Sequence, residues 1–220
     1  MSENIHPLNM LSASEISDAV SILKQSNKAH ENSSFSYISL EEPEKKLLKE
    51  NTNLERIVKI VGVSKESRGF EASISLSKKE VLKEEEISNN AGPTYTLAEI
   101  FKAIELTMEN KDYQKALKKR GIEDLSLIQI DPWPGGGFVN KNIKNGNRAL
   151  RAISFLKDSE KDNAYARPIQ GLIAHVDLTE KQVVEIEDHG VIKVPEAHAR
   201  YDKDGQDSLR ENPKEIAITQ

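Results

Sequence analysis

The chain has 220 residues, 37% apolar and 30% charged, which is enough to bury one large core or two small ones. Its net charge of −5 offers no basic surface to nucleic acid or anionic lipid, and zero cysteines exclude disulfides, thiolate metal sites and a cysteine nucleophile. No stretch is long and apolar enough to span a bilayer, and no basic-then-apolar leader begins the chain. We therefore expect a soluble, cytoplasmic protein that binds neither nucleic acid nor membrane.

The first half of the sequence predicts one helix followed by strands. Ser12 and Glu15 have the spacing of a capping box, and the apolar residues after them predict an amphipathic helix from about Ser14 to Gln25. Alternating or β-branched residues then predict strands at Phe35 to Leu40, Arg56 to Val63, Phe70 to Leu76 and Val81 to Ile87.

The second half predicts the same order. Thr96 and Glu99 repeat the capping-box spacing. The helix that they begin carries an apolar stripe, formed by Ile100, Phe101, Ile104 and Met108. A short helix from about Lys111 to Arg120 is expected to end at Gly121, which suits a left-handed cap. Strands are predicted at Leu125 to Ile130, Ala149 to Phe155, Ile169 to Leu178 and Gln182 to Glu187.

Two hairpins also match residue by residue. Ser75-Leu-Ser-Lys-Lys-Glu-Val-Leu-Lys-Glu-Glu aligns without gaps with Asp177-Leu-Thr-Glu-Lys-Gln-Val-Val-Glu-Ile-Glu. Chance similarity would explain one hairpin as well as duplication does, but the shared order of elements favours two copies of one fold. We predict an α+β protein of two tandem domains, each a helix packed on a four-stranded antiparallel sheet whose other face meets solvent.

The domain boundary is expected at Asn89-Asn-Ala-Gly-Pro, a turn-rich stretch without an apolar pattern. This places the first domain at residues 6–92 and the second at residues 93–195. Residues 196–220 are charged and carry little to bury, so they are expected to form an extended arm or linker.

The histidines give little sign of a metal centre. They lie at positions 6, 30, 175, 189 and 198 and form no His-x-His pair and no helical i, i+4 pair. His175 and Asp177 share one face of a predicted strand, and His189 follows two carboxylates, which offers at most a weak site. We interpret His175 as a half-exposed strand residue and His189 as a turn residue, and predict no metal site.

Catalytic motifs are also missing. There is no Gly-x-Ser-x-Gly elbow, and Gly135-Gly-Gly lacks the following Lys-Ser/Thr of a phosphate-binding loop, so no catalytic residue is predicted. Glu84-Glu-Glu is interpreted as a solvated strand edge. Asp131-Pro-Trp-Pro-Gly-Gly-Gly-Phe holds the only tryptophan, Trp133. Two interpretations of Trp133 fit the sequence equally well. It forms the wall of an apolar ligand site or a docking point for another subunit, or it closes the end of the domain core.

Several segments of the second half resemble the third N-terminal domain of the copper amine oxidases. They are Arg120-Gly-Ile-Glu-Asp-Leu, Asp131-Pro-Trp, Asp162-Asn-Ala-Tyr-Ala-Arg-Pro-Ile-Gln-Gly, Val176-Asp-Leu, Glu187-Asp-His-Gly and Val194-Pro-Glu. The first half is similar, more loosely, to the second N-terminal domain, through His6-Pro-Leu, Ser14-Glu-Ile and Tyr37-Ile-Ser-Leu-Glu-Glu-Pro. The resemblance implies two cystatin-like, helix-on-sheet domains, as the element order also predicts.

In that family the third N-terminal domain supplies part of the wall of a channel leading to the quinone of the catalytic domain. By position, the resemblance assigns Phe101, Pro132, Trp133 and Tyr165 to this wall. Packing is the competing interpretation, above all for Phe101 on its apolar stripe.

The catalytic parts of the family are absent from this sequence. The quinone precursor lies in an Asn-Tyr-Asp/Glu motif, but no tyrosine here, at positions 37, 95, 113, 165 and 201, follows an asparagine. The His-x-His copper ligands and the catalytic aspartate belong to the missing domain. The resemblance therefore implies that this chain binds no cofactor, and that copper and the tyrosine-derived quinone lie in a partner catalytic subunit.

The leading hypothesis is a noncatalytic subunit of a split primary-amine (tyramine-type) oxidase, which pairs with a copper amine oxidase catalytic subunit. Pro213-Lys-Glu-Ile-Ala-Ile-Thr-Gln, which resembles the linker into the catalytic domain, adds to this expectation. The alternative is a freestanding module of two cystatin-like domains that binds a small ligand or a protein. A fragment without function is the third possibility.

Overall fold

The computed structural model describes residues 6–50, 54–64, 68–88, 92–136, 140–197, 200 and 205. The chain divides into two compact units mainly between Phe101 and Lys102, with residues 143–148 and 178–180 grouped with the first unit. Two four-stranded antiparallel sheets confirm the predicted α+β fold. The domain boundary at 92/93 stays a prediction, because the linker residues 89–91 lie outside the described part, as does most of the predicted arm.

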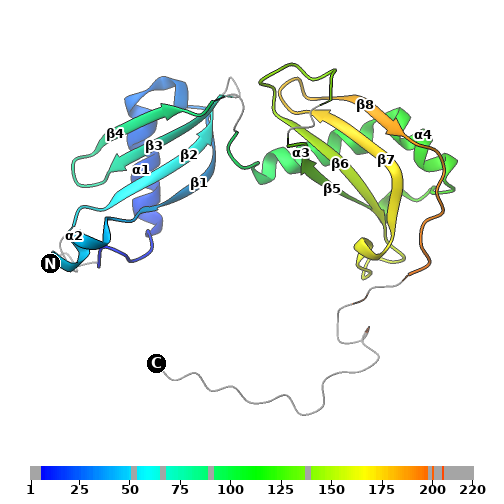
Figure 1. Ribbon diagram of the computed structural model, residues 1–220, viewed down its shortest axis with the longest axis horizontal. Coiled ribbons are helices and arrows are strands. Elements are labelled where there is room, and N and C mark those ends of the chain that lie inside the picture. Colours follow the sequence, from blue (N-terminus) through cyan, green and yellow to red (C-terminus); the bar gives the residue numbers. More distant parts are fainter. Residues whose placement is uncertain are drawn as a thin grey trace, which may run out of the picture. The chain divides into compact units, whose positions relative to one another are not determined.

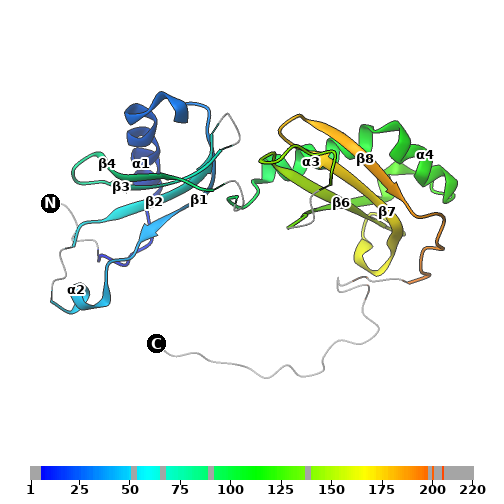
Figure 2. The same cartoon turned by 45° about the horizontal axis from the view of Figure 1, so that its top comes forward.

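The first sheet carries one helix on one of its faces (Figures 1 and 2). Its elements are α1 (Ala13–Ser26), β1 (Ser34–Glu41), β2 (Ile57–Val63), β3 (Gly69–Ser75) and β4 (Glu80–Glu86). The strands lie in chain order and each agrees with its predicted position to within one residue. The capping box is confirmed, because the Ser12 amide donates to Glu15 Oε2 over 2.8 Å and the Glu15 amide donates to Ser12 Oγ over 3.2 Å.

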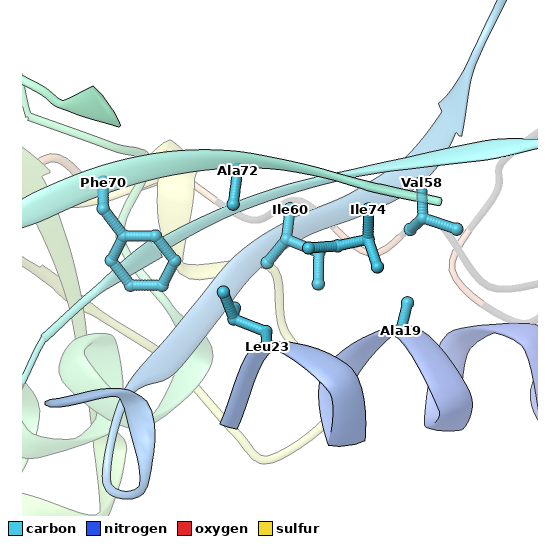
Figure 3. Packing of buried hydrophobic residues seen from close by; sticks show 7 residues of the cluster. All are labelled: Ala19, Leu23, Val58, Ile60, Phe70, Ala72 and Ile74. Atoms are coloured by element: carbon cyan, nitrogen blue, oxygen red, sulfur yellow. The ribbon is translucent and has the colours of Figure 1, made fainter. Parts of the chain in front are cut away.

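The core of this unit lies between α1 and the two central strands. Figure 3 shows Ala19 and Leu23 of the helix facing the apolar side chains of β2 and β3, namely Val58, Ile60, Phe70, Ala72 and Ile74. Alternate strand residues point to the same face, which is why every second residue of β2 and β3 is apolar. Each large side chain buried in this way contributes about 1.5–3 kcal/mol.

Two short helices of the first unit were not predicted. Helix α2 (Lys45–Glu50) has no buried residue, so it lacks the apolar stripe by which a helix is recognised in a sequence. The 3₁₀ helix η1 (Lys28–His30) buries His30, whose Nε2 lies 2.9 Å from Glu84 Oε1. The interpretation of Glu84-Glu-Glu as a solvated strand edge is confirmed, because these residues are exposed on the edge strand β4, and Glu84 in addition supplies the hydrogen-bond partner that the buried imidazole needs.

The second sheet follows the same plan, with two helices on one side (Figures 1 and 2). Its helices are α3 (Leu97–Glu109), α4 (Lys111–Lys119), and the 3₁₀ helices η2 (Leu125–Leu127) and η3 (Ala164–Ala166). Its strands are β5 (Ile128–Pro134), β6 (Ala149–Leu156), β7 (Pro168–Asp177) and β8 (Gln182–Asp188), in chain order. As predicted, α4 ends before Gly121, whose φ is +75°.

The predicted strand at Leu125 to Ile130 is displaced. Residues Leu125–Leu127 form η2 instead, capped by the Asp124 carboxylate, which accepts from the Ser126 amide over 2.9 Å. Strand β5 continues through Pro132 to Pro134. It is an edge strand, and a proline without N–H is tolerated there because one side of the strand makes no ladder bonds.

The apolar stripe predicted for α3 is also partly wrong. Ala103 and Thr107 are fully buried, whereas Phe101 is 63% exposed. Phe101 lies about 100° around the helix from Ile100, so it points away from the face that packs on the sheet. The interpretation of Phe101 as a core residue of the second sheet therefore fails. In α4, Tyr113 is fully buried and its Oη lies 2.6 Å from Ser154 Oγ of β6.

The two hairpins that match in sequence also match in geometry. Lys79 and Lys181, at equivalent turn positions, have φ of 56° and 55° and are the only described non-glycine residues with positive φ. The register shift between Ser73 and Ile74 recurs between His175 and Val176, the equivalent positions. These shared irregularities support the interpretation that the two sheets are copies of one fold.

Candidate functional site

The outer face of the second sheet, the face turned away from α3 and α4, is the candidate site. Along β6, Leu150, Ala152 and Ser154 are buried toward the helices, so the residues between them point outward. The strand register then places the outward side chains of the four strands beside one another. They are Asp131, Trp133, Arg151, Ile153, Phe155, Ile173, His175, Glu185 and Glu187.

A carboxylate organises two exposed aromatic side chains at one end of this face. The indole Nε1–H of Trp133 donates to Asp131 Oδ2 over 2.8 Å, and the Tyr165 hydroxyl donates to the same oxygen over 3.0 Å. Tyr165 also packs edge-on against Phe155, with ring centroids 4.9 Å apart. The hydrogen bond to Asp131 is the main reason why the pKa of Tyr165 lies above its ordinary value.

Local structure brings these groups together from segments far apart in the sequence. Asp131 and Trp133 are two residues apart on β5, so their side chains share a face. Tyr165 lies in η3, where the Asn163 side chain caps the turn by accepting from the Tyr165 amide over 3.0 Å. We call Asp131, Trp133 and Tyr165 the aromatic clamp.

The four residues assigned to a channel wall therefore have different surroundings. Trp133 and Tyr165 are 56% and 55% exposed and belong to the aromatic clamp. The core interpretation of Trp133 thus fails for this unit. Pro132 is buried on the helix side of β5, and Phe101 is exposed on α3. Asp131 was not among the predicted residues, although its i, i+2 spacing to Trp133 on a strand was the available signal.

At the opposite edge of this face, on and just after β7 and β8, two histidines share one carboxylate. His175 Nε2 lies 2.8 Å from Glu187 Oε2, and His189 Nε2 lies 2.6 Å from Glu187 Oε1. The hydrogen bond from His175, followed by that from His189, lowers the pKa of Glu187. His175 is 7% exposed, so the prediction of a half-exposed strand histidine is wrong. Among the described residues no group of three or more side chains is arranged to hold a metal ion.

The equivalent face of the first sheet is different in character. Lys59 pairs with Glu71, and Lys83 Nζ lies 2.9 Å from Glu85 Oε2. The Ser73 hydroxyl donates to a further carboxylate, that of Glu41, over 2.6 Å. The charged side chains of this face thus pair with neighbours on the same face, as expected of a surface that meets water. The aromatic clamp and the isoleucines make the outer face of the second sheet the better interaction surface.

The clamp presents two aromatic walls held by a shared acceptor. Its one hydroxyl, that of Tyr165, donates to Asp131, and this bond raises the pKa of Tyr165, so the carboxylate does not activate the hydroxyl as a nucleophile. No described helix combines the length and apolar character needed to cross a bilayer.

Family models match both halves of the chain. The model for the copper amine oxidase N2 domain matches residues 6–55, and that for the copper amine oxidase N3 domain matches residues 98–205. The primary amine oxidase of Arthrobacter sp. (strain P1) is 34% identical over 98% of this chain, and that of Klebsiella aerogenes is 32% identical over 98%. The chain covers 33% and 29% of these two proteins, so it spans about a third of their length.

Solved structures agree on the fold. A copper-containing benzylamine oxidase from Hansenula polymorpha superposes with a TM-score of 0.73 at 15% identity, over 97% of this chain and 36% of its own. The lysyl oxidase of Pichia pastoris gives a TM-score of 0.51 at 12% identity, over 96% of this chain and 35% of its own. Since both halves match consecutive domains of one kind of protein, the chain belongs to the copper amine oxidase family, of which it carries the N2 and N3 domains.

Proposed function

We propose that this chain is the noncatalytic subunit of a primary-amine (tyramine-type) oxidase and that it completes the substrate channel of a copper amine oxidase catalytic chain. The observation that carries the proposal is the aromatic clamp, because Trp133 and Tyr165 are more than half exposed and yet fixed by Asp131. Aromatic groups that are rigid before binding lose little conformational entropy when a partner covers them.

The family relationship supports the choice of a catalytic copper amine oxidase chain as the proposed partner. The chain spans about a third of relatives named primary amine oxidase. The proposal assigns amine oxidation, with its copper and tyrosine-derived quinone, to a separate polypeptide that carries the remaining part of such a protein. We place the assembly in the cytoplasm, since a chain without cysteine suits a reducing compartment.

Within the part of the chain that the structure describes, no group of three or more side chains is arranged to hold a copper ion. On the outer face of the second sheet, His175 and His189 both direct Nε2 at Glu187, so these nitrogens are occupied and no third ligand completes a set. The role that we propose for the chain is to shape an apolar passage and to exclude water from it.

We assign a different role to each of the predicted wall residues. Trp133 and Tyr165 form the wall itself. When the partner covers them, their bulk limits the size of the amine that passes. Pro132, buried behind them, fixes the backbone that carries Trp133. Phe101, 63% exposed on α3, is available for contact with the catalytic chain.

Assembly tests this proposal directly. The purified chain is mixed with the purified copper- and quinone-containing amine oxidase chain of the same organism, and complex formation is followed by sedimentation velocity. We expect a stable complex that the double variant Trp133→Ala, Tyr165→Ala weakens. Tyr37→Ala is the matched control, because Tyr37 is 54% exposed on the outer face of the first sheet. Absence of a complex, or equal weakening by Tyr37→Ala, contradicts the proposal.

A further inference from the structure

Arg151 on the outer face of the second sheet has lost the counter-charge that its equivalent in the first sheet retains. The second strands align without gaps, with Arg56 preceding β2 and Arg148 preceding β6, so that Lys59 corresponds to Arg151. Registers agree, since Lys59 pairs with Ser73 on β3 and Arg151 pairs with His175 on β7.

The two sheets differ at a neighbouring position on their third strands. Glu71, the ion-pair partner of Lys59, lies opposite Val61. At the equivalent place Ile173 lies opposite Ile153. The cation has thus been kept on the second sheet, while an isoleucine stands where its carboxylate would be.

No carboxylate in the described part of this face takes over that role. Asp131 accepts from Trp133 and Tyr165, Glu185 accepts from Asn140 over 2.7 Å, and Glu187 serves the two histidines. Among the described residues Arg151 forms no ion pair, and its Nε is buried without a hydrogen-bond partner.

The surroundings of Arg151 raise the cost of this unmatched charge. Its direct cross-strand neighbours are Trp133 on β5 and His175 on β7. Arg151 is half-buried beside these residues, and its Nε is buried. A partly buried guanidinium is stabilised best by a carboxylate that accepts two parallel hydrogen bonds.

We infer that the outer face of the second sheet docks against the catalytic chain, and that an aspartate or glutamate of that chain pairs with Arg151 between Trp133 and Ile173. This inference rests on the proposed function, which supplies the partner. A protein carboxylate fits better than a free anion, because Arg151 is the only lysine or arginine on the described part of this face and its neighbours are largely apolar. Such a charge pair, enclosed by apolar groups, is typical of interface centres.

Three variants of this chain test the inference by their affinity for the catalytic chain. Arg151→Gln removes the charge and should weaken binding about 30-fold or more, as truncation of a buried ion pair does. Arg151→Lys keeps the charge but loses the two-pronged geometry, so it should bind with intermediate affinity. Ile173→Glu recreates within this chain the arrangement of Lys59 and Glu71, and should weaken binding by competing with the partner's carboxylate.

Lys59→Gln is the matched control. It removes the equivalent cation from the first sheet and should change affinity less than about threefold, since exposed ion pairs contribute little. Thermal unfolding of each isolated variant verifies that it is folded. The affinity of the wild-type chain should fall as salt rises, and that of Arg151→Gln should depend on salt more weakly.

The outcomes separate this inference from the proposed function. If the wild-type chain does not bind the catalytic chain, both fail. If it binds and Arg151→Gln binds equally well, only the inference about Arg151 is overturned. It is also overturned if Arg151→Gln instead abolishes self-association of this chain, which would identify a second copy as the occupant. Stabilisation of the isolated wild-type chain, but not of Arg151→Gln, by sodium acetate would identify a free-carboxylate site and overturn it as well.

Discussion

Nε of Arg148 donates to Oε1 of Glu99 over 2.5 Å, and Nη2 of the same guanidinium donates to Oε2 over 3.1 Å. Arg56 and Glu15 repeat this contact between the start of α1 and the start of β2, at 2.6 and 3.2 Å. In each case the carboxylate belongs to the capping box of a helix, and the arginine directly precedes the second strand of a sheet. The pair therefore ties the start of a helix to the start of a strand.

Removing either carboxylate should destabilise the fold. Glu15→Gln and Glu99→Gln should each lower the free energy of unfolding by about 1.5–3 kcal/mol, the range for hydrogen bonds to charged groups, as measured by urea denaturation. Glu105→Gln is the control, because Glu105 forms an exposed i, i+3 pair with Lys102 and should contribute less than about 0.5 kcal/mol. Similar losses for all three variants would contradict this role.

The same pairs should contribute to acid unfolding. The hydrogen bond from Arg56 is the main cause that lowers the pKa of Glu15; burial raises that of Glu99, but its bonds to Arg148 and Thr96 lower it overall. A carboxylate with a lowered folded-state pKa stabilises the fold above its unfolded pKa, and this stabilisation is lost as pH falls through about 4 and below. The difference between wild type and each Gln variant should therefore shrink over that interval, and a constant difference would exclude this linkage.

Tyr113 should govern part of the alkaline behaviour. Burial raises its pKa to about 12, because the phenolate would lose its hydration. A raised folded-state pKa means that stability is fully present below the unfolded pKa near 10 and is lost as pH rises toward 12. Tyr113→Phe should cost about 1–3 kcal/mol at neutral pH by leaving Ser154 unsatisfied, and should remove this alkaline component. An unchanged stability difference between pH about 9 and 12 would contradict the assignment.

The left-handed turn residues offer a stabilising substitution. A non-glycine residue in this conformation costs about 1–2 kcal/mol, whereas glycine adopts it without a steric penalty but loses more entropy on folding. Lys79→Gly and Lys181→Gly should thus each raise the free energy of unfolding by roughly 0.5–1 kcal/mol. Lys181→Ala retains the β-carbon and should leave stability nearly unchanged. Denaturant titrations measure the free energy of unfolding of each variant. A loss of stability in both glycine variants would show that the two lysines are not strained.

The aromatic clamp should matter for binding more than for folding. Trp133 and Tyr165 are more than half exposed, so replacing either by Ala should change the free energy of unfolding by less than about 1 kcal/mol. In the assembled oxidase the same changes should alter the ratio of kcat/KM for bulky and small primary amines. A large stability loss with unchanged kinetics and assembly would show instead that both are packing residues.

Regular periodicity made most of the fold predictable. Both capping boxes, the alternation in β2 and β3, and the hairpin match were visible in the sequence and recur in the structure. The predictions of secondary structure failed where contacts between elements, rather than the local sequence, determine the structure. The predicted strand stopped at Ile130, but β5 continues through Pro132 to Pro134, because an edge position tolerates proline. Helix α2 buries nothing, so it left no pattern to detect.

The candidate site was predictable only in part. Exposed aromatic residues at Trp133 and Tyr165 followed from the resemblance, but their shared acceptor Asp131 depends on η3 meeting β5. The pairing of Arg148 with Glu99 joins residues far apart in the sequence. Among the described residues Arg151 has no counter-charge, because Ile173 stands where the first sheet has Glu71, and a single strand pattern does not reveal this.

Amine turnover by the reconstituted assembly tests most directly whether this chain lines the passage to a redox centre on another polypeptide. The catalytic chain of the same organism is assayed with a small and a bulky primary amine, alone and after saturation with this chain. We predict that this chain alone oxidises neither amine, and that its addition shifts the ratio of the two kcat/KM values, with a smaller shift for Trp133→Ala. Turnover by the isolated chain, or an unchanged ratio at saturation, would contradict the account.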